Sequence, residues 1–581
     1  MTSVKVSEYG SWKSPITSAL VTQGGVGLGY DSLVQIDDAG QEYADVAYWA
    51  ESRFDEAGRV VICSKRLGAE QFEVWTPKGF NVRSRCHEYG GGSYFVHGSS
   101  VYFCNFADNR MYVQKSSDDE PTPLTPADCG WRYADGQISE KLNRILCVRE
   151  DHSGIETGKT KEAVNTVIMI MPDTKEQKVL SQGVSGWYNA VLDTMESPKY
   201  EKEIGGPQWQ FGPKSYVFDP QDSRKVAITY EGKIEIFDLT SKESTKLETG
   251  FTSHDHLCYS YDGYIYCRAG SPVKFKCIIR VNAKTGKTDI LRESRSSDID
   301  EGYLSVAEPI TFPTADNDVA HAYFYPPKNK DFKAPEGSLP PLLVQIHGGP
   351  TAACSPDLNL NHQYFTSRGF ALLDVNYRGS TGYGTKYRNK LRGNWGVHDI
   401  EDSCHGALYL ANEAKKVDPK RLAISGGSAG GYTTLACLTF KDVFKAGVSH
   451  YGVGNLEALA TDTHKFESRY LDTIIGKYPE EKHVYIDRSP VHFADKLNAS
   501  VAFFQGEDDK VVLPNQAEEM FSLVKAKGLP TAYVLFPGEG HGFRKSENIQ
   551  ASMDGEFYFY SKVFSFEPAE TPYEMDIINL K

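Results

Sequence analysis

Long apolar runs are missing from this 581-residue chain. A membrane-spanning helix needs roughly 18–20 consecutive apolar residues, so the sequence predicts no membrane span. Basic clusters are also missing, and the formal net charge is −14. This charge argues against nucleic acid or an anionic membrane surface as the main partner. The N-terminal residues lack the charged-then-apolar pattern of a secretory signal, which favours a soluble protein.

Cysteine is present but shows no organised spacing. The eleven cysteines are odd in number and scattered, and no pair has the spacing of zinc ligands. Several of them lie inside strand-like runs, so we interpret them as buried free thiols in a reducing compartment. We therefore expect a cytoplasmic protein with no metal and no cofactor. A chain of this length exceeds one hydrophobic core, so two or more domains are expected.

The N-terminal half contains short Tyr-, Val- and Ile-rich runs with period-two alternation. These strands fall into five sets that recur at roughly forty residues, the period of a four-stranded propeller blade. An array of β-sandwiches is the alternative, but it would not require so even a period. Between Ser181 and Pro213 the rhythm fails, and Gly186–Glu196 has a more helical pattern. A sixth, degenerate blade or a helical insertion would both fit this stretch.

The pattern changes at Tyr303, where short apolar strands begin to alternate with helical segments. After a leading antiparallel pair, six such strands are predicted between Leu342 and Phe536. Alternating strands and helices predict a parallel, doubly wound sheet that is covered on both faces. The predicted organisation is an N-terminal arm (1–20), a β-propeller (21–302) and an α/β domain (303–581).

The most informative stretch of the α/β domain is Gly426-Gly-Ser-Ala-Gly430. It follows a short apolar strand and precedes a helical pattern, which is the context of a nucleophile elbow. Flanking glycines let neighbouring backbone approach the strained serine without a Cβ clash. The alternative is a glycine-rich turn with an incidental serine. The strand before and the helix after it favour Ser428 as a nucleophile.

The partners of such a serine should follow it in the order acid, then histidine, on loops after later strands. One loop is Gly506-Glu-Asp-Asp-Lys510, and the next is Pro537-Gly-Glu-Gly-His-Gly-Phe543. His541 can accept the serine proton, while a carboxylate fixes the tautomer of its ring. Asp509 is the preferred acid and Asp508 the reserve. Two such loops on consecutive strands argue against ordinary polar turns.

Two further loops are candidates for binding. The developing oxyanion needs preorganised donors, and the N–H of Ala429 is one. The other is expected from His347-Gly-Gly-Pro350 after an early strand. Because proline has no N–H, Gly348 or Gly349 is the predicted donor. In the propeller half, Arg85-Cys-His-Glu-Tyr-Gly-Gly-Gly92 could reach into a cavity, although an ordinary turn between blades explains it as well.

Together these residues resemble the prolyl oligopeptidase family of serine peptidases, in its dipeptidyl-peptidase and acylaminoacyl-peptidase branch. The matching strings are His347-Gly-Gly-Pro350, Asn376-Tyr-Arg-Gly-Ser-Thr-Gly-Tyr-Gly384, Gly426-Gly-Ser-Ala-Gly-Gly431, Gln505-Gly-x-x-Asp509 and Gly540-His-Gly-Phe543. The resemblance implies a β-propeller capping an α/β-hydrolase domain, and its spacing also selects Asp509. It implies that Glu88 anchors the free amino terminus of a substrate.

By the same resemblance, three aromatic residues that follow the strand after the nucleophile helix are candidates for an apolar S1 pocket. They are Tyr451, Phe466 and Tyr470, and ordinary core packing explains them equally well. Relatives carry about seven blades, within the usual range for propellers. The irregular stretch near residues 181–213 therefore suggests a reduced propeller with a remodelled substrate entrance.

Three functions compete. The leading one is a serine peptidase that cleaves short peptides through an acyl-enzyme. The second is an esterase, amidase or acyltransferase acting on a non-peptide metabolite, because a fold and triad do not define the acyl group. The third is a catalytically silent propeller scaffold, against which the complete triad argues. The expected partner is thus a short peptide or small acyl substrate, and formation of a homo-oligomer is left open.

Overall fold

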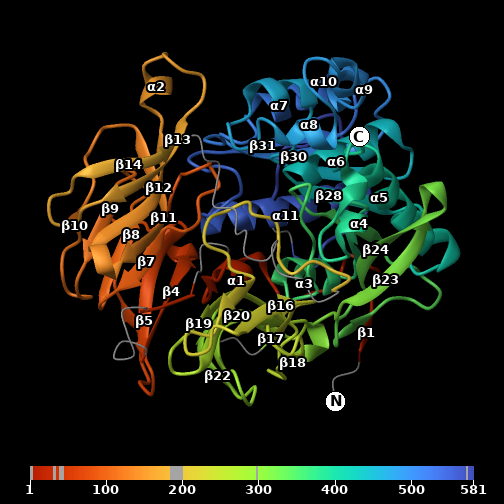
Figure 1. Cartoon of the computed structure of the whole chain (residues 1–581). Helices are drawn as coiled ribbons and strands as arrows, with labels where there is room; N and C mark the ends of the chain where they lie inside the picture. Colours follow the sequence, from red (N-terminus) through yellow and green to blue (C-terminus); the bar gives the residue numbers. More distant parts are fainter. Residues whose placement is uncertain are drawn as a thin grey trace. The chain divides into compact units, whose positions relative to one another are not determined.

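The computed structural model describes residues 4–29, 34–37, 45–182, 200–295, 299–570 and 573–580. The chain divides into two compact units. Unit 1 comprises Met1–Gly24, Ser297–Thr463 and Glu467–Lys581, and unit 2 comprises Gly25–Ser296 and His464–Phe466. Figure 1 labels many of the elements of both units. Among the described residues, no helix is both long enough and apolar enough to cross a membrane.

Unit 2 is a β-propeller, as predicted, and its described residues form five antiparallel sheets. The first consists of β2 (Val26–Gly27), β4 (Val46–Arg53), β5 (Arg59–Arg66) and β6 (Glu73–Val74), with β3 (Val34–Ile36) beside β4. The second consists of β7 (Tyr94–His97), β8 (Ser100–Cys104), β9 (Met111–Gln114) and β10 (Thr122–Pro123). The third consists of β11 (Trp131–Ser139), β12 (Arg144–Asp151), β13 (Val164–Ile170) and β14 (Gln177–Gln182), with the short helix α2 (Ser153–Glu156) between β12 and β13.

The two remaining sheets of unit 2 follow the same four-stranded plan. The fourth consists of β15 (Tyr216–Phe218), β16 (Lys225–Tyr230), β17 (Lys233–Asp238) and β18 (Ser244–Lys246). The fifth consists of β19 (Ser253–Tyr259), β20 (Tyr264–Ser271), β21 (Lys274–Asn282) and β22 (Thr288–Glu293). The five predicted strand sets therefore correspond to the five sheets, although β2, β3 and β11 were not predicted from the sequence.

Buried side chains join neighbouring sheets of the propeller. Phe95 of the second sheet packs with Ile145 of the third, and Val96 of the second packs with Ile62 of the first. Trp49 of the first sheet lies in one buried cluster with Tyr266 of the fifth sheet. A second buried cluster joins the fifth sheet to the fourth. Each fully buried aromatic or aliphatic side chain contributes roughly 2–3 kcal/mol. Apolar packing thus links the sheets in the spatial order third, second, first, fifth, fourth.

The irregular stretch of the sequence lies between the third and fourth sheets. Residues 183–199, which include the segment with a helical pattern, lie outside the described residues. Residues 200–215 are described and contain no strand, only an isolated bridge between Gly91 and Phe211. The idea of a remodelled entrance therefore stays a prediction.

Unit 1 contains an eight-stranded sheet, and its order agrees with the predicted α/β pattern. The order is β23 (Glu308–Thr314), β24 (Asp318–Tyr325), β27 (Ala371–Asn376), β26 (Leu342–Ile346), β28 (Leu422–Gly427), β29 (Ala446–His450), β30 (Ser500–Gly506) and β31 (Thr531–Phe536). The two leading strands are antiparallel, and the other six run parallel to one another. The inner parallel strands β27, β28 and β30 are almost wholly buried because helices cover both faces of such a sheet, whereas the edge strand β31 is partly exposed.

The helices of unit 1 connect and cover these strands (Figure 1). They are α3 (Leu360–Thr366), α4 (Thr385–Arg388), α5 (His398–Leu408), α6 (Ala429–Phe440), α7 (Leu456–Asp462), α8 (Tyr470–Ile474), α9 (Lys482–Asp487), α10 (Asn515–Ala526) and α11 (Ser546–Val563). Helix α6 is buried along nearly its whole length. The helix that begins directly after the candidate serine is therefore part of the core.

The first residues of the chain pack on this α/β unit. Strand β1 (Lys5–Val6) pairs with β25 (Phe332–Lys333), and α1 (Ser18–Thr22) contacts α11. The guanidinium of Arg368 donates a hydrogen bond to the carbonyl of Ile16 at 2.8 Å. The compact units divide at Gly24 and Ser297. The functional boundaries placed at residues 20 and 302 remain a prediction.

Candidate active site

Ser428 lies at the sharp turn between β28 and α6. Its φ and ψ angles are 57° and −122°, which is a strained conformation for a residue with a side chain. The turn is held because the N–H of Ser428 donates to the carbonyl of His450 at 3.0 Å. A Cβ on Gly426 would lie 2.5 Å from the carbonyl carbon of Gly430, and one on Gly430 would lie 2.2 Å from the carbonyl oxygen of Ile346. Only glycine fits at both positions.

The structure brings Ser428, His541 and Asp509 into one hydrogen-bonded chain. His541 Nε2 lies 2.9 Å from Ser428 Oγ, and His541 Nδ1 lies 2.8 Å from Asp509 Oδ2. A carboxylate only accepts hydrogen bonds, so the proton of the neutral ring belongs on Nδ1. The lone pair of Nε2 then faces the serine hydroxyl and can accept its proton.

Asp509 is fully buried, and its environment is built to hold an anion. Its Oδ1 accepts hydrogen bonds from the backbone N–H groups of Val511 and Val512 at 2.8 and 3.0 Å. The neighbouring Asp508, the reserve candidate, is exposed. The buried acid is therefore Asp509, the residue that the sequence favoured.

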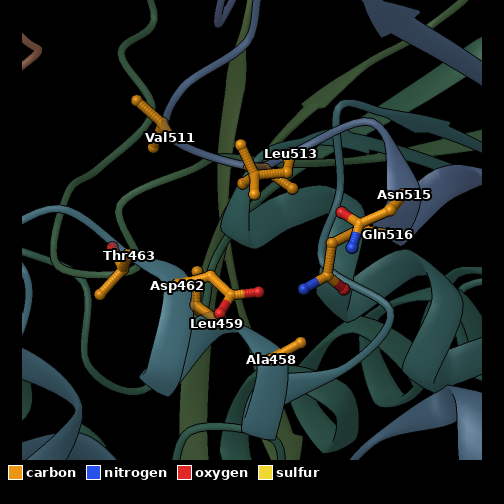
Figure 2. A pocket seen from close by; sticks show the side chains of 9 residues that line it. Ala458, Leu459, Asp462, Thr463, Val511, Leu513, Asn515 and Gln516 are labelled. Carbon is orange, nitrogen blue, oxygen red and sulfur yellow. The ribbon is translucent and has the colours of Figure 1, made fainter. Parts of the chain in front are cut away.

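The segment after Asp509 rests on helix α7. Figure 2 shows a small pocket whose lining side chains come from α7, from Thr463 directly after it, and from residues 511–516. The side-chain oxygen of Gln516 accepts hydrogen bonds from the backbone N–H groups of Gly454 and Asn455 at 3.0 and 2.8 Å. The loop that carries the acid is thus fixed by packing and hydrogen bonds, unlike a simple polar turn.

Candidate oxyanion donors lie beside the serine. A Cβ built on Gly348 would be 3.2 Å from the carbonyl oxygen of Gly427 and 3.5 Å from Ser428 Cβ. The loop after β26 therefore passes directly along the nucleophile. Among the described residues, no group accepts a hydrogen bond from the N–H of Gly348, Gly349 or Ala429. All three donors are available for a developing negative charge.

The ring of His347 fixes the start of this loop. Its Nδ1 donates to the carbonyl of Gly348 at 2.8 Å, and its Nε2 accepts from Ser380 Oγ at 2.8 Å. The ring stacks on Tyr377 with centroids 4.4 Å apart, and the Tyr377 hydroxyl donates to the carbonyl of Pro350 at 2.8 Å. Burial lowers the pKa of His347 to about 4, so the ring stays neutral near pH 7.

Tyr377 and Ser380 were not predicted as site residues. They belong to Asn376-Tyr-Arg-Gly-Ser-Thr-Gly-Tyr-Gly384, a string that the sequence analysis used only to support the resemblance. The available signal was their place in that string, directly after β27. Their contacts show that the string supports the His347–Pro350 loop.

Of the three aromatic candidates for substrate binding, Tyr451 lies nearest the triad. Its ring centroid is 4.8 Å from that of His541 and 5.4 Å from that of Phe543. A Cβ on Gly427 would lie 2.9 Å from the Tyr451 hydroxyl. The ring of Tyr451 therefore borders the histidine and the turn that carries Ser428.

Phe466 belongs to unit 2, whereas Tyr451 and Tyr470 belong to unit 1. Its ring stacks on that of His87 with centroids 4.9 Å apart, and it also contacts Tyr89 and Trp209 edge-on. The structure thus places Phe466 beside the loop that carries Glu88. Tyr470, in contrast, is in unit 1, where its hydroxyl bonds to Thr351.

Glu88 is partly exposed and paired with an arginine. Its backbone has a φ of 64°, and its carboxylate lies 2.5 Å from Arg132 Nη1. Beneath it, buried Glu150 accepts a hydrogen bond from the N–H of His87 at 3.2 Å and contacts the His152 ring at 2.8 Å. Burial opposes ionisation of Glu150, but the hydrogen bond from His152 and the nearby cationic groups outweigh it and lower the pKa. Glu88 on this loop and Glu150 on β12 are therefore both carboxylates with cationic or histidine partners.

One group of side chains in the described residues has the composition of a metal site. Ligand atoms of Asp316, His398 and Glu401 lie within 4.8 Å of one another. However, the guanidinium of Arg378 contacts both carboxylates, at 3.3 and 2.9 Å. A buried cation thus already pairs with these acids, and an ion-pair network accounts for the group.

The site and sheet together define a hydrolase of the α/β-hydrolase fold with a Ser–His–Asp triad geometry. The profile described as the prolyl oligopeptidase family matches residues 356–567. A puromycin-hydrolyzing peptidase of Mycobacterium tuberculosis is 30% identical, with a TM-score of 0.84 over 98% of this chain and 99% of that one. A crystal structure of puromycin hydrolase is 28% identical, with a TM-score of 0.85 over 98% and 100% of the two chains.

These similarities place the chain in the prolyl oligopeptidase family. A dipeptidyl aminopeptidase BIII of Pseudoxanthomonas mexicana is 33% identical over 253 residues, which are 42% of this chain and 36% of that protein. The chain thus matches about a third of the length of that relative. The predicted family and the predicted propeller-plus-hydrolase fold are confirmed.

Proposed function

We propose that the chain is a serine peptidase that cleaves short peptides through an acyl-enzyme. The observation that carries the proposal is the hydrogen-bonded chain from Ser428 Oγ to His541 Nε2 and from His541 Nδ1 to Asp509. A buried acid, an oriented ring and a strained serine are together what nucleophilic acyl transfer requires. The complete triad also argues against a silent scaffold.

The geometry supports the following sequence of steps. Ser428 Oγ attacks the substrate carbonyl while its proton passes to His541 Nε2. The resulting oxyanion is stabilised by the N–H of Ala429 and that of Gly348 or Gly349. The imidazolium then gives its proton to the leaving amine, the C–N bond breaks, and the acyl-enzyme remains. Water repeats the attack with His541 as base, which releases the acid and restores the serine.

Glu88 is proposed to recognise a free amino terminus of the substrate. Its carboxylate is 20% exposed and lies on the same loop as His87, on which Phe466 stacks. A partly buried carboxylate favours an ammonium group, and an adjacent aromatic face adds cation–π attraction. The name of one relative, a dipeptidyl aminopeptidase, is consistent with such a substrate. Tyr451 is proposed to form part of the S1 wall beside His541.

A second candidate function uses the same triad as an esterase, amidase or acyltransferase on a non-peptide metabolite, including an amide whose leaving group is not a peptide. Two of the solved relatives are named for puromycin hydrolysis, so puromycin belongs among the compounds to be tested. This candidate keeps the triad, the oxyanion donors and the acyl-enzyme, and it differs from the first in the group that leaves or in the group that accepts the acyl. The predicted esterase or acyltransferase alternatives would be recognised by turnover of esters without turnover of amides.

We also propose a cytoplasmic location and a role that needs no cofactor. All eleven cysteines are free thiols, and most are buried. Free thiols in this number suit a reducing compartment. The steps derived above use only groups of the chain and water.

The test is turnover of aminoacyl-, dipeptidyl- and N-acetyl-aminoacyl-p-nitroanilides, puromycin and a p-nitrophenyl ester. We expect cleavage of at least one amide by the native protein and none by Ser428→Ala. Glu88→Gln should raise KM for substrates with a free amine by roughly tenfold or more and leave N-acetylated ones unchanged. If Ser428→Ala keeps its amidase activity, or only the ester is cleaved, the peptidase proposal is wrong.

A further inference from the structure

Tyr470, at the start of α8, binds the loop that follows the candidate oxyanion donors. Its hydroxyl oxygen lies 3.1 Å from the backbone nitrogen of Thr351 and 2.5 Å from Thr351 Oγ1. A backbone N–H only donates, so the Tyr470 oxygen accepts that hydrogen bond, while either hydroxyl can be the donor in the bond between Tyr470 and Thr351 Oγ1. Burial raises the pKa of Tyr470, which keeps the hydroxyl protonated. One side chain thus makes two hydrogen bonds to one residue.

Thr351 is only two residues from Gly349, one of the candidate donors. The loop is also held where Tyr377 donates to the carbonyl of Pro350 and where the N–H of Thr381 donates to the carbonyl of Ala352, both at 2.8 Å. These two contacts bind carbonyl groups. Tyr470 instead binds the N–H and side chain of Thr351, so it restrains the loop through a different set of groups.

Helix α8 is itself fixed to the body of unit 1. The N–H of Gly393 donates to the carbonyl of Thr473, and the N–H of Trp395 donates to the carbonyl of Ile474, both at 3.0 Å. Leu471 and Ile474 are buried. A tyrosine on this short helix is therefore a rigid support for the loop. A mobile side chain on the surface could not restrain a backbone N–H in this way.

We propose that Tyr470 is a positioning residue, which acts through Thr351 to hold the Gly348–Gly349 donors at the oxyanion. This inference rests on the proposed function, and it gives Tyr470 a role other than that of an S1 wall. A shift of the donors by a fraction of an ångström weakens binding of the transition state and leaves binding of the ground-state substrate almost unchanged. The effect should therefore appear in kcat rather than in KM.

The test compares Tyr470→Phe with Tyr485→Phe. Tyr485 is a matched control because it is fully buried in the neighbouring α9 and donates to a backbone carbonyl, that of Gly476, at 2.6 Å. Removal of an oxyanion donor costs about 10²–10³ in kcat, so misplacement of one should cost roughly tenfold. We expect Tyr470→Phe to lower kcat about tenfold with KM changed less than twofold, and Tyr485→Phe to change neither.

A second readout does not depend on finding a peptide substrate. Ser428 Oγ displaces fluoride from a fluorophosphonate probe, and the developing charge on the phosphoryl oxygen needs the same donors. We expect slower labelling of Tyr470→Phe and normal labelling of Tyr485→Phe, with no labelling of Ser428→Ala. Thr351→Ser, which keeps the hydroxyl, should retain faster labelling than Thr351→Val.

The outcomes are separable. Labelling without cleavage of any amide would contradict the proposed function and still measure the effect of Tyr470. The inference is overturned if Tyr470→Phe labels as fast as Tyr485→Phe. It is also overturned if Tyr470→Phe raises KM and changes the preferred P1 side chain while kcat stays constant, because that result describes an S1 wall.

Discussion

Replacement of Asp509 by asparagine tests the proposed triad most severely, since it changes the chemistry and preserves the shape. In the native protein Asp509 Oδ2 accepts from His541 Nδ1 at 2.8 Å, and Oδ1 accepts from two backbone N–H groups. An asparagine that keeps the two backbone bonds presents its NH₂ group to His541. The ring must then carry its proton on Nε2, where it cannot accept the proton of Ser428.

The asparagine could preserve the productive tautomer of His541 by turning its side-chain oxygen toward the ring. Its NH₂ group would then face the N–H groups of Val511 and Val512, which would lose their acceptor inside the protein. An unsatisfied buried donor costs about 1–3 kcal/mol, so the two together cost about 2–6 kcal/mol. Because of this cost, we expect the unproductive tautomer to dominate. The expected loss in kcat is about 10⁴-fold, equivalent to about 5.5 kcal/mol.

The assay is the steady-state kcat of Asp509→Asn on the best p-nitroanilide, with Asp508→Asn as the matched control. Asp508 is adjacent, equally charged and exposed, so its substitution should change kcat less than twofold. The thermal unfolding midpoint of both variants should confirm that they are folded. The reasoning is refuted if Asp509→Asn retains more than a tenth of the native kcat while folded, or if Asp508→Asn loses as much.

Two further predictions concern stability. Gly430→Ala should lower the free energy of unfolding by at least 1–3 kcal/mol, because its Cβ would lie 2.2 Å from the carbonyl oxygen of Ile346; Gly206→Ala, where nothing lies within 4 Å, should be neutral in the same urea titration. Burial raises the pKa of Asp399 to about 6, so the folded protein holds a proton that the unfolded chain releases near pH 4, and stability falls as pH rises from about 4 to 6. Asp399→Asn should remove up to ~3 kcal/mol of this loss in the free energy of unfolding. At pH 7 the variant should therefore unfold at a higher urea concentration than the native protein, whereas at pH 4.5 it should not. Equal midpoint shifts at both pH values would contradict the second prediction.

The triad could be predicted from the sequence because each of its residues lies in a short motif or in a loop directly after a recognisable strand. Gly-x-Ser-x-Gly requires glycines at the turn, and both Gly426 and Gly430 face backbone atoms within 2.5 Å of a built Cβ. The loops with Asp509 and His541 follow consecutive parallel strands, whose carboxyl ends meet at one edge of a sheet. Chain order and strand alternation therefore suffice to bring the three residues together.

The surroundings of the candidate substrate-binding residues could not be predicted in this way, since they depend on long-range packing. Phe466 follows helix α7 by only a few residues, yet it stacks on His87, more than 370 positions earlier in the chain. Tyr470, four residues further on, binds Thr351 instead. No periodicity or motif distinguishes these two aromatic residues, because their neighbours are set by the tertiary fold.

The strand pattern likewise predicted the regular blades and missed the irregular strands. β11 was missed because a bulge between Ala134 and Gln137 interrupts its alternation. β2 and β3 are only two and three residues long, too short to show a period. The helical prediction for Gly186–Glu196 lies outside the described residues.

The first segment of unit 1, residues 1–24, contains the predicted arm (1–20) and sets the order in which the α/β unit can be completed during synthesis. Residues 5–22 pack on strand β25, on Arg368 and on helix α11, all of which emerge from the ribosome hundreds of residues later. The arm, with its buried Trp12 and Ile16, must wait while the propeller sequence is translated. A gene fragment that encodes residues 299–581 alone would leave the surface for this arm uncovered, so supplying residues 1–24 as a separate peptide should improve its solubility.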